Sequence, residues 1–284
     1  MPLSRPCAIM LDSAEPVSAL SVLVTADPLA KAQAARDFRA AVLAGRALIP
    51  CDPPDSPARP QKPDLVPASQ LARRRLGSPE GRAALLHAIA HIELNAIDLA
   101  MDMIARFAHA PDIIGETDDF VCDWSSVAND EARHFVMIEE RLTELGFSYG
   151  DFPAHGGLWD AAMATRSDVA ARLAIAPLVL EARGLDVTPG LIEKLDQARD
   201  THSADILRII YEEEVGHVAI GMKWLRYTAR VRKVDPETLF KTMVTEFFNG
   251  RIRPPFNHVA RSKAQFPLSY YTGIVSEGAK SRAH

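Results

Sequence analysis

The stretch Arg208-Ile-Ile-Tyr-Glu-Glu-Glu-Val-Gly-His217 decides the fold that this chain is predicted to adopt. It contains Glu214 and His217, and residues three apart lie on one face of an α-helix. A carboxylate and an imidazole placed in this way can bind one metal ion between them. The earlier stretch Val127-Ala-Asn-Asp-Glu-Ala-Arg-His134 repeats the Glu-x-x-His spacing. Two such helices, face to face, could hold two ions.

Chance does not account for both motifs. With nine His in the chain, about half an accidental Glu-x-x-His pair is expected, whereas two are present. The earlier pair, Glu131 and His134, lies in a helix predicted from 117–118 to about 146. The later pair lies in a helix predicted over 203–231. Both helices have apolar residues at helical spacing.

Two further glutamates lie on the apolar faces of predicted helices. Glu93 belongs to a helix that begins at Ser78-Pro79 and ends near residue 110, and Glu181 to a helix that begins near residue 168. A carboxylate on an apolar face needs a partner. Counted along antiparallel helices at about 1.5 Å per residue, Glu93 lies level with Glu131, and Glu181 with Glu214.

These four helices predict an all-α fold, a four-helix bundle over residues 79–232 with one long crossover after Gly146. Residues 1–78 are predicted to pack on the bundle as an arm or strand-like segment, a helix from Asp27-Pro28 to Gly45, and a proline-rich segment. We prefer a belt laid over the bundle to a flexible linker for the prolines between 50 and 67. Residues 233–284 are predicted to form a C-terminal helix and an aromatic tail. One structural domain is expected.

Composition excludes several classes of protein. A formal net charge of -5 lacks the basic footprint of nucleic-acid binders. No apolar run approaches about 20 residues, so no membrane span is expected, and the N-terminus lacks the pattern of a signal peptide. The three cysteines are scattered, which argues against a disulfide framework or a cysteine zinc site and favours a cytoplasmic location.

The motifs resemble the six ligands of the ferritin-like di-iron carboxylate superfamily, in its chain order: Glu93, Glu131, His134, Glu181, Glu214 and His217. His87–Asp98, Leu180–Val187 and Pro254–Asn257 are similar to an uncharacterised bacterial branch, a ferritin-like domain of unknown function. The tRNA-modifying hydroxylases are a more distant branch. The resemblance implies a fold and a metal site but no substrate.

Four carboxylates and two imidazoles would balance two divalent ions in charge. Such ligands suit iron best, with manganese or a mixed manganese–iron pair as alternatives and zinc as a substitute. We expect Glu131 and Glu214 to bridge the ions, because their helices also supply the histidines. Two reduced irons could activate dioxygen for hydroxylation, desaturation or radical formation. The electron donor is not identified.

An acid precedes each motif glutamate, and metal-bound imidazoles usually donate their second N–H to a carboxylate. We expect Asp130 to contact His217 and Glu213 to contact His134, the alternative being two surface acids. His87 and His91 lie off the face of Glu93. They are predicted to pair with Asp98, with Asp102 or with the flanking arms.

A substrate entrance is predicted where the third helix is expected to break, at Gly184 to Pro189, after a bend at Pro177. The hypothesis places a pocket at Glu181, Arg183, Leu185 and the aromatic tail, in which Phe256, Tyr270 and Tyr271 are long enough to cover an opening. The alternative is a kink filled by side chains. Tyr211 lies one turn before Glu214, where a structural role is favoured over a redox role.

Three classes of function remain open. The first is a di-metal oxidoreductase that acts on an unknown small molecule with dioxygen, or a tRNA hydroxylase, which the acidic charge disfavours. The second is a non-catalytic metal-binding or peroxide-scavenging ferritin relative. The third is a helical interaction protein with a vestigial site. Catalytic residues are not assigned, and a homodimer is left open.

Overall fold

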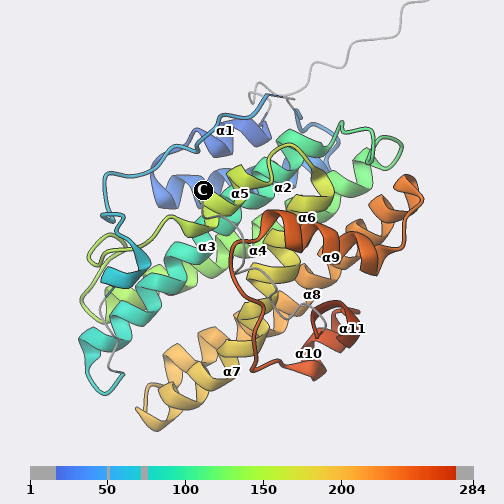
Figure 1. The fold of residues 1–284 in the computed structure, drawn as a ribbon. Coiled ribbons are helices and arrows are strands. Elements are labelled where there is room, and N and C mark those ends of the chain that lie inside the picture. Colours follow the sequence, from blue (N-terminus) through green and yellow to red (C-terminus); the bar gives the residue numbers. More distant parts are fainter. Residues whose placement is uncertain (1–16, 50–51, 72–75, 273–284) are drawn as a thin grey trace, which may run out of the picture.

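The computed structural model describes residues 17–49, 52–71 and 76–272 (Figure 1). Within these ranges every regular element is helical, so the predicted all-α class is confirmed. The elements are α1 (Ala19–Leu23), α2 (Pro28–Leu43), the short turn η1 (Ala68–Gln70), α3 (Pro79–Phe107), α4 (Thr117–Glu144), α5 (Gly157–Ala164), α6 (Val169–Ile175), the π-helical segment η2 (Ala176–Glu181), α7 (Ala182–Gln197), α8 (Thr201–Arg232), α9 (Pro236–Phe247), α10 (His258–Lys263) and α11 (Leu268–Tyr271).

The N-terminal expectation is corrected in part. Residues 17–26 were expected to form an arm or strand-like segment, but a Ser18–Ser21 capping box begins the short helix α1 there. The remainder of that segment, like the basic run Arg73–Arg75, lies outside the described residues.

Polar caps set where the main helices begin. Asp27, Ser78 and Asp235 each accept a backbone N–H of the first turn, and a proline follows each of them at the first helical position. Asp168 caps α6 in the same way. Proline is tolerated there because its missing N–H would have no helical partner. Local sequence therefore determines these four starts.

Two ion-pair clusters define the opposite ends of the bundle. At one end, Arg82 at the start of α3 and Arg141 near the end of α4 both bind Asp200, just before α8, at 2.9 and 2.8 Å. At the other end, Arg232 at the end of α8 binds Asp112, between α3 and α4, and Asp168, at the start of α6. Hence α3 and α8 run in one direction, whereas α4 and α6–α7 run in the other.

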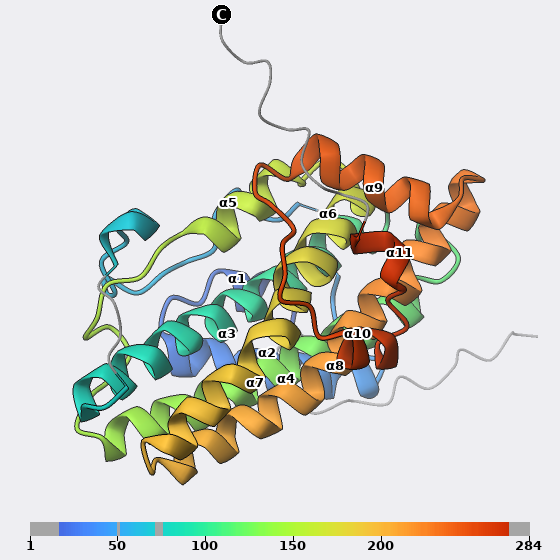
Figure 2. The same cartoon turned by 60° about the horizontal axis from the view of Figure 1, so that its bottom comes forward.

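This arrangement requires one long crossover. The chain leaves α4 at one end of the bundle and starts α6 at the other, and residues 145–168, with α5, cover the distance (Figures 1 and 2). α3 is long and apolar enough to cross a membrane, but 78% of its most apolar window is buried inside the molecule. Its burial is that of a core helix.

The proline-rich segment 52–67 is tied to the bundle. Ala58 N–H donates to Leu23 O of α1 at 2.8 Å, and Trp159 Nε1 of α5 donates to Asp55 O at 3.0 Å. Arg59 reaches Asp98 of α3, which also binds the buried Lys31 of α2. One buried carboxylate thus joins α2, α3 and the proline-rich segment.

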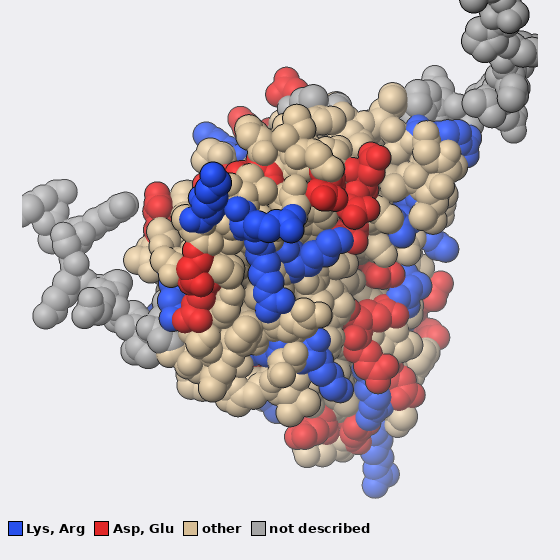
Figure 3. Space-filling model, turned by 90° about the vertical axis from the view of Figure 1, so that its right-hand side faces the viewer, with Lys and Arg blue, Asp and Glu red and all other residues tan. Residues whose placement is uncertain are grey.

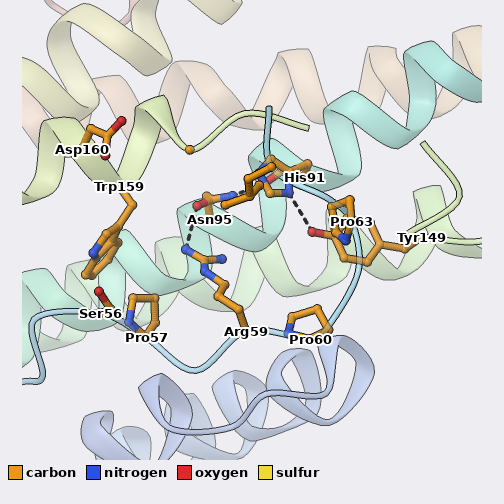
Figure 4. Close-up of a pocket in the computed structure, with 12 residues that line it drawn as sticks. Ser56, Pro57, Arg59, Pro60, Pro63, His91, Asn95, Tyr149, Trp159 and Asp160 are labelled. Carbon is orange, nitrogen blue, oxygen red and sulfur yellow. Dashed lines mark hydrogen bonds between the residues drawn. The ribbon is translucent and has the colours of Figure 1, made fainter. Parts of the chain in front are cut away.

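His87 and His91 contact the crossover. His91 Nδ1 lies 2.7 Å from Tyr149 Oη, and Gly150 N–H donates to His87 Nε2 at 2.9 Å. His91 and Tyr149 lie in the lining of a pocket of about 220 Å³ between the proline-rich segment, α3 and the crossover (Figure 4). These contacts are with the crossover, which was not among the partners predicted for the two histidines.

The expected break at Gly184 to Pro189 is wrong, because α7 is continuous through it. Pro189 cannot donate to the carbonyl of Leu185, four residues earlier. The side-chain amide of Asn257 donates to that carbonyl instead, at 3.2 Å. A residue 72 positions away in sequence therefore supplies the hydrogen bond that proline removes.

The irregular part of the third helix lies earlier, in η2 around Pro177, where a bend was predicted. Gly221 of α8 faces it, and a Cβ at this glycine would lie only 2.7 Å from Pro177 Cβ. The two helices approach too closely here for any side chain on Gly221. The π-helical turn accommodates the proline, which lacks a backbone donor.

The C-terminal tail, as far as residue 272, packs on the bundle. After α9, residues 248–257 form a strap that crosses η2 and α7 and leads to α10 (Figures 1 and 2). Arg183 of α7 donates to Arg253 O and Pro255 O of this strap, at 3.0 and 2.9 Å. Tyr270 and Tyr271 are buried.

Candidate metal centre

α3, α4 and α8 bring together a buried cluster of acids and imidazole. Glu93, Glu131, His134 and Glu214 each offer one ligand atom, and these atoms lie within 4.8 Å of one another. Glu93, Glu131 and His134 are buried, and the side chain of Glu214 is 13% exposed. A cluster of this composition could hold a metal ion.

Both histidines turn Nδ1 toward the carboxylates. His134 Nδ1 lies 3.2 Å from Glu93 Oε2 and 3.4 Å from Glu131 Oε2. His217 Nδ1 lies 3.1 Å from Glu131 Oε1 and 3.7 Å from Glu214 Oε2. Each oxygen of Glu131 therefore faces a different imidazole. Glu131 lies between them at the centre of the cluster.

Glu181 approaches from the fourth side, at the end of η2. Its Oε2 is buried without a hydrogen-bond partner among the described residues. Burial and the nearby carboxylates of Glu214 and Glu131 raise its pKa well above the ordinary value. Glu181 is not among the four residues whose ligand atoms lie within 4.8 Å of one another, but the charges of Glu214 and Glu131 act on its pKa.

The outer nitrogen of each imidazole faces an acid from the neighbouring motif. His134 Nε2 lies 2.6 Å from Glu213 Oε2, and His217 Nε2 lies 3.5 Å from Asp130 Oδ2. The structure thus brings each acid to the imidazole with which the sequence paired it. Arg133 forms an ion pair with Glu213 and lies 3.7 Å from Asp130. Arg133, absent from the predicted site, links the two outer acids.

The metal-free cluster balances its charge with protons. Burial and the carboxylate of Glu131 raise the pKa of Glu93 well above the ordinary value, and burial and Glu131 also raise that of Glu214. Although burial alone would raise it, the pKa of Glu131 is held well below the ordinary value by the neighbouring carboxyl group of Glu93 and by the charge on His217.

Burial and the neighbouring carboxylates act in opposite directions on the pKa values of the two imidazoles. Burial alone would lower their pKa values, but hydrogen bonds to Glu131 and Glu93 raise the pKa of His134 to about 11. The charges of Glu131 and Glu214 raise the pKa of His217 well above the ordinary value. These directions favour an ionised Glu131 between two protonated imidazoles when no cation is bound.

Several ligand atoms of the cluster lack hydrogen bonds to one another and are better explained as ligands of a metal ion. Five buried ligand atoms have no well-formed hydrogen bond among the described residues: both oxygens of Glu131, Oε2 of Glu181 and Glu214, and Nδ1 of His217. Buried polar atoms without partners are uncommon in folded proteins and costly. Converging carboxylate oxygens and imidazole nitrogens are the ligands that iron, manganese and zinc accept.

Of the residues predicted to bound a pocket, Arg183 and Phe256 line one, whereas Glu181 and Leu185 are not in its lining. Leu185 is fully buried in the core. Tyr211 Oη accepts a hydrogen bond from the Asn257 amide at 2.8 Å, which favours a structural role. Gly184 has no atom within 4 Å of an added Cβ, so the space beside it is open. Arg183 and Phe256 line a separate pocket under the strap.

Comparison with known proteins finds relatives without a stated activity. Residues 24–272 match the family described as "Protein of unknown function (DUF455)". An "Uncharacterized protein" of Haemophilus influenzae is 41% identical over 254 residues, which cover 87% of this chain and 88% of the relative. No solved structure matches the chain.

Proposed function

Since this chain belongs to the family of unknown function DUF455, we propose its function from the cluster itself: a ferritin-like di-metal carboxylate protein. Its activity in this proposal is that of an oxidoreductase that uses two iron ions and dioxygen to oxidise or hydroxylate a small organic molecule. The topology with one long crossover supports the ferritin-like assignment, because such bundles carry their sites between facing helices.

The observation that carries the proposal is the position of Glu131. Its two oxygens face two imidazole Nδ1 atoms, at 3.4 and 3.1 Å, and neither oxygen has a well-formed hydrogen bond. A carboxylate that faces two metal-binding nitrogens suits a bridge between two ions.

The six residues have distinct roles in this proposal. Glu93 and His134 would hold one ion, Glu181 and His217 the other, and Glu131 and Glu214 would bridge them. When bound, two reduced irons supply electrons for the reduction of dioxygen.

The outer acids orient the imidazoles. Glu213 and Asp130 accept the Nε2 protons, so that the Nδ1 lone pairs of His134 and His217 point inward. Ala128, Ala132 and Phe135 of α4 are fully buried and limit water around the carboxylates.

Metal analysis tests the proposal directly. Protein purified from its native host is expected to contain two ions per chain, iron first, with manganese or a manganese–iron pair as the alternatives and zinc as a substitute. Adding oxygen to the reduced iron form is expected to change its optical spectrum. Glu131→Gln should lose metal, whereas the matched change at exposed Glu140 should retain it. Equal metal content in both variants would refute the bridging role.

A non-catalytic metal-binding or peroxide-scavenging protein is the second candidate. The pocket beside the proline-rich segment and the pocket under the strap are both lined by residues other than the six, so neither of these two pockets opens onto the proposed ligands. The iron-loaded protein should then consume hydrogen peroxide faster than dioxygen, with no organic substrate required.

A small-molecule substrate is preferred to tRNA. Figure 3 shows Lys and Arg side chains gathered on one face with rows of Asp and Glu beside them, so that face is not uniformly basic. A nucleic-acid backbone needs a continuous basic surface. The interaction protein with a vestigial site is the least supported class, because four potential ligands converge.

A further inference from the structure

A pocket of about 180 Å³ lies between η2, the start of α7 and the strap. Its apolar wall consists of Leu178, Val179 and Leu180 from η2, with Phe248 and Ile252 from the strap. Figure 2 shows the strap passing across this part of the bundle. The pocket is thus enclosed by two segments that are distant in sequence.

The lining is strongly basic. It contains four arginines and one acid, Asp186. Arg261 is buried and binds both oxygens of Asp186, at 2.9 and 2.7 Å, which neutralises that pair. Arg183 donates to two carbonyl groups of the strap. Its contacts hold the strap in place.

Two guanidinium groups remain for a ligand. Arg251 and Arg253 are exposed, and no described residue forms an ion pair or side-chain hydrogen bond with either side chain. They belong to the strap on both sides of Ile252. A planar guanidinium favours carboxylate or phosphate oxygens. The basic groups therefore lie next to an apolar wall, with no acid left to balance them.

We propose that this pocket binds an organic carboxylate that carries an apolar chain. The carboxylate pairs with Arg251 and Arg253, and the chain lies against Leu178, Leu180 and Ile252. The inference concerns binding and does not depend on metal in the Glu–His cluster. Because η2 ends at Glu181, a ligand seated here contacts the segment that positions one of the proposed metal ligands.

Calorimetric titration of the full chain with decanoate tests the proposal, with decanol and acetate as probes that each lack one half of the ligand. Decanoate is expected to bind at least about tenfold more tightly than either, because charge-assisted hydrogen bonds and apolar contact are both required. Comparable binding of decanol would overturn the role of the arginines. Comparable binding of acetate would overturn the role of the apolar wall.

Variants locate the site. The double change Arg251→Gln and Arg253→Gln should weaken decanoate binding about tenfold or more, whereas the charge-matched change of exposed Arg36 and Arg46 to Gln should not. Ile252→Gln should weaken binding without removing a charge. Unchanged affinity in the first double variant would place the site elsewhere. Titration of metal-free and metal-loaded protein separates this inference from the proposed function, because decanoate binding is expected in both.

Discussion

Replacing Asn257 by Ala should destabilise the fold mainly by leaving the carbonyl of Leu185 without a hydrogen bond, because Pro189 cannot donate to it. The side chain caps α10 by accepting from Ala260 N–H, donates to Leu185 O and donates to Tyr211 Oη. Loss of a cap costs about 1 kcal/mol, and an unsatisfied buried carbonyl about 1–3 kcal/mol. The expected loss in the free energy of unfolding is therefore about 2–4 kcal/mol.

A double-mutant cycle isolates the part of this loss in the free energy of unfolding that depends on Pro189. In a Pro189→Ala background, the new backbone N–H can satisfy Leu185 O, so Asn257→Ala should cost less by about 1 kcal/mol or more. Urea unfolding of the wild type, both single variants and the double variant measures this difference. Asn257→Ser is the control, because serine retains a capping oxygen. Costs that add within about 0.5 kcal/mol would refute the compensation.

Three further predictions concern packing, charge and the metal centre. Gly221→Ala should destabilise the protein by about 1–3 kcal/mol, because the new Cβ would collide with Pro177. Gly190→Ala is the control: no atom lies within 4 Å of its new Cβ, so it should stabilise α7 by up to about 1 kcal/mol. Thermal unfolding distinguishes the two variants. Burial would raise the pKa of Asp168, but Arg232 holds it below its ordinary value of 3.8, so the ion pair stabilises the fold above that pH and ceases to do so as pH falls through the lowered pKa. Asp168→Asn, which retains a cap, should therefore cost about 1 kcal/mol at pH 7 and progressively less in acid. An equal cost in urea unfolding at pH 7 and in acid would contradict this. Glu213→Gln should weaken metal binding about tenfold in a competition titration with a chelator, and an equal effect of Glu212→Gln, at an exposed position, would show that only surface charge matters.

Local sequence was sufficient for the starts of most long helices and for the shared faces of the motif glutamates and histidines. Capping residues and apolar periodicity act within one or two turns, so the starts at Pro28, Pro79 and Pro236 were predictable. The same applies to Glu131 and His134, whose spacing on one helix determines that they share a face. Antiparallel counting then placed Glu93 level with Glu131, and the structure brings both into one cluster.

Long-range contacts account for what sequence could not predict. Pro189 carries a strong local signal for a break, but the compensating amide comes from Asn257, which no local pattern connects to it. The helix break on which the predicted entrance rested is therefore absent, although Arg183 and Phe256 line a pocket under the strap. Arg133 was overlooked as a link between the outer acids, although its place three residues after Asp130 on the same helix was a usable signal.

The π-helical segment η2 acts as a phase shift within the third helix. An α-helix turns about 100° per residue, and a π-helical turn holds extra backbone, so the faces of α6 and α7 need not continue one another. α6 can therefore keep the angular position that suits α9, while α7 keeps the one that suits α8 and the strap. Glu181, the last residue of η2, has its direction determined by this offset. Deleting one residue between Ala176 and Leu180 would bring the two halves into phase and, in doing so, would rotate Glu181 relative to Glu214.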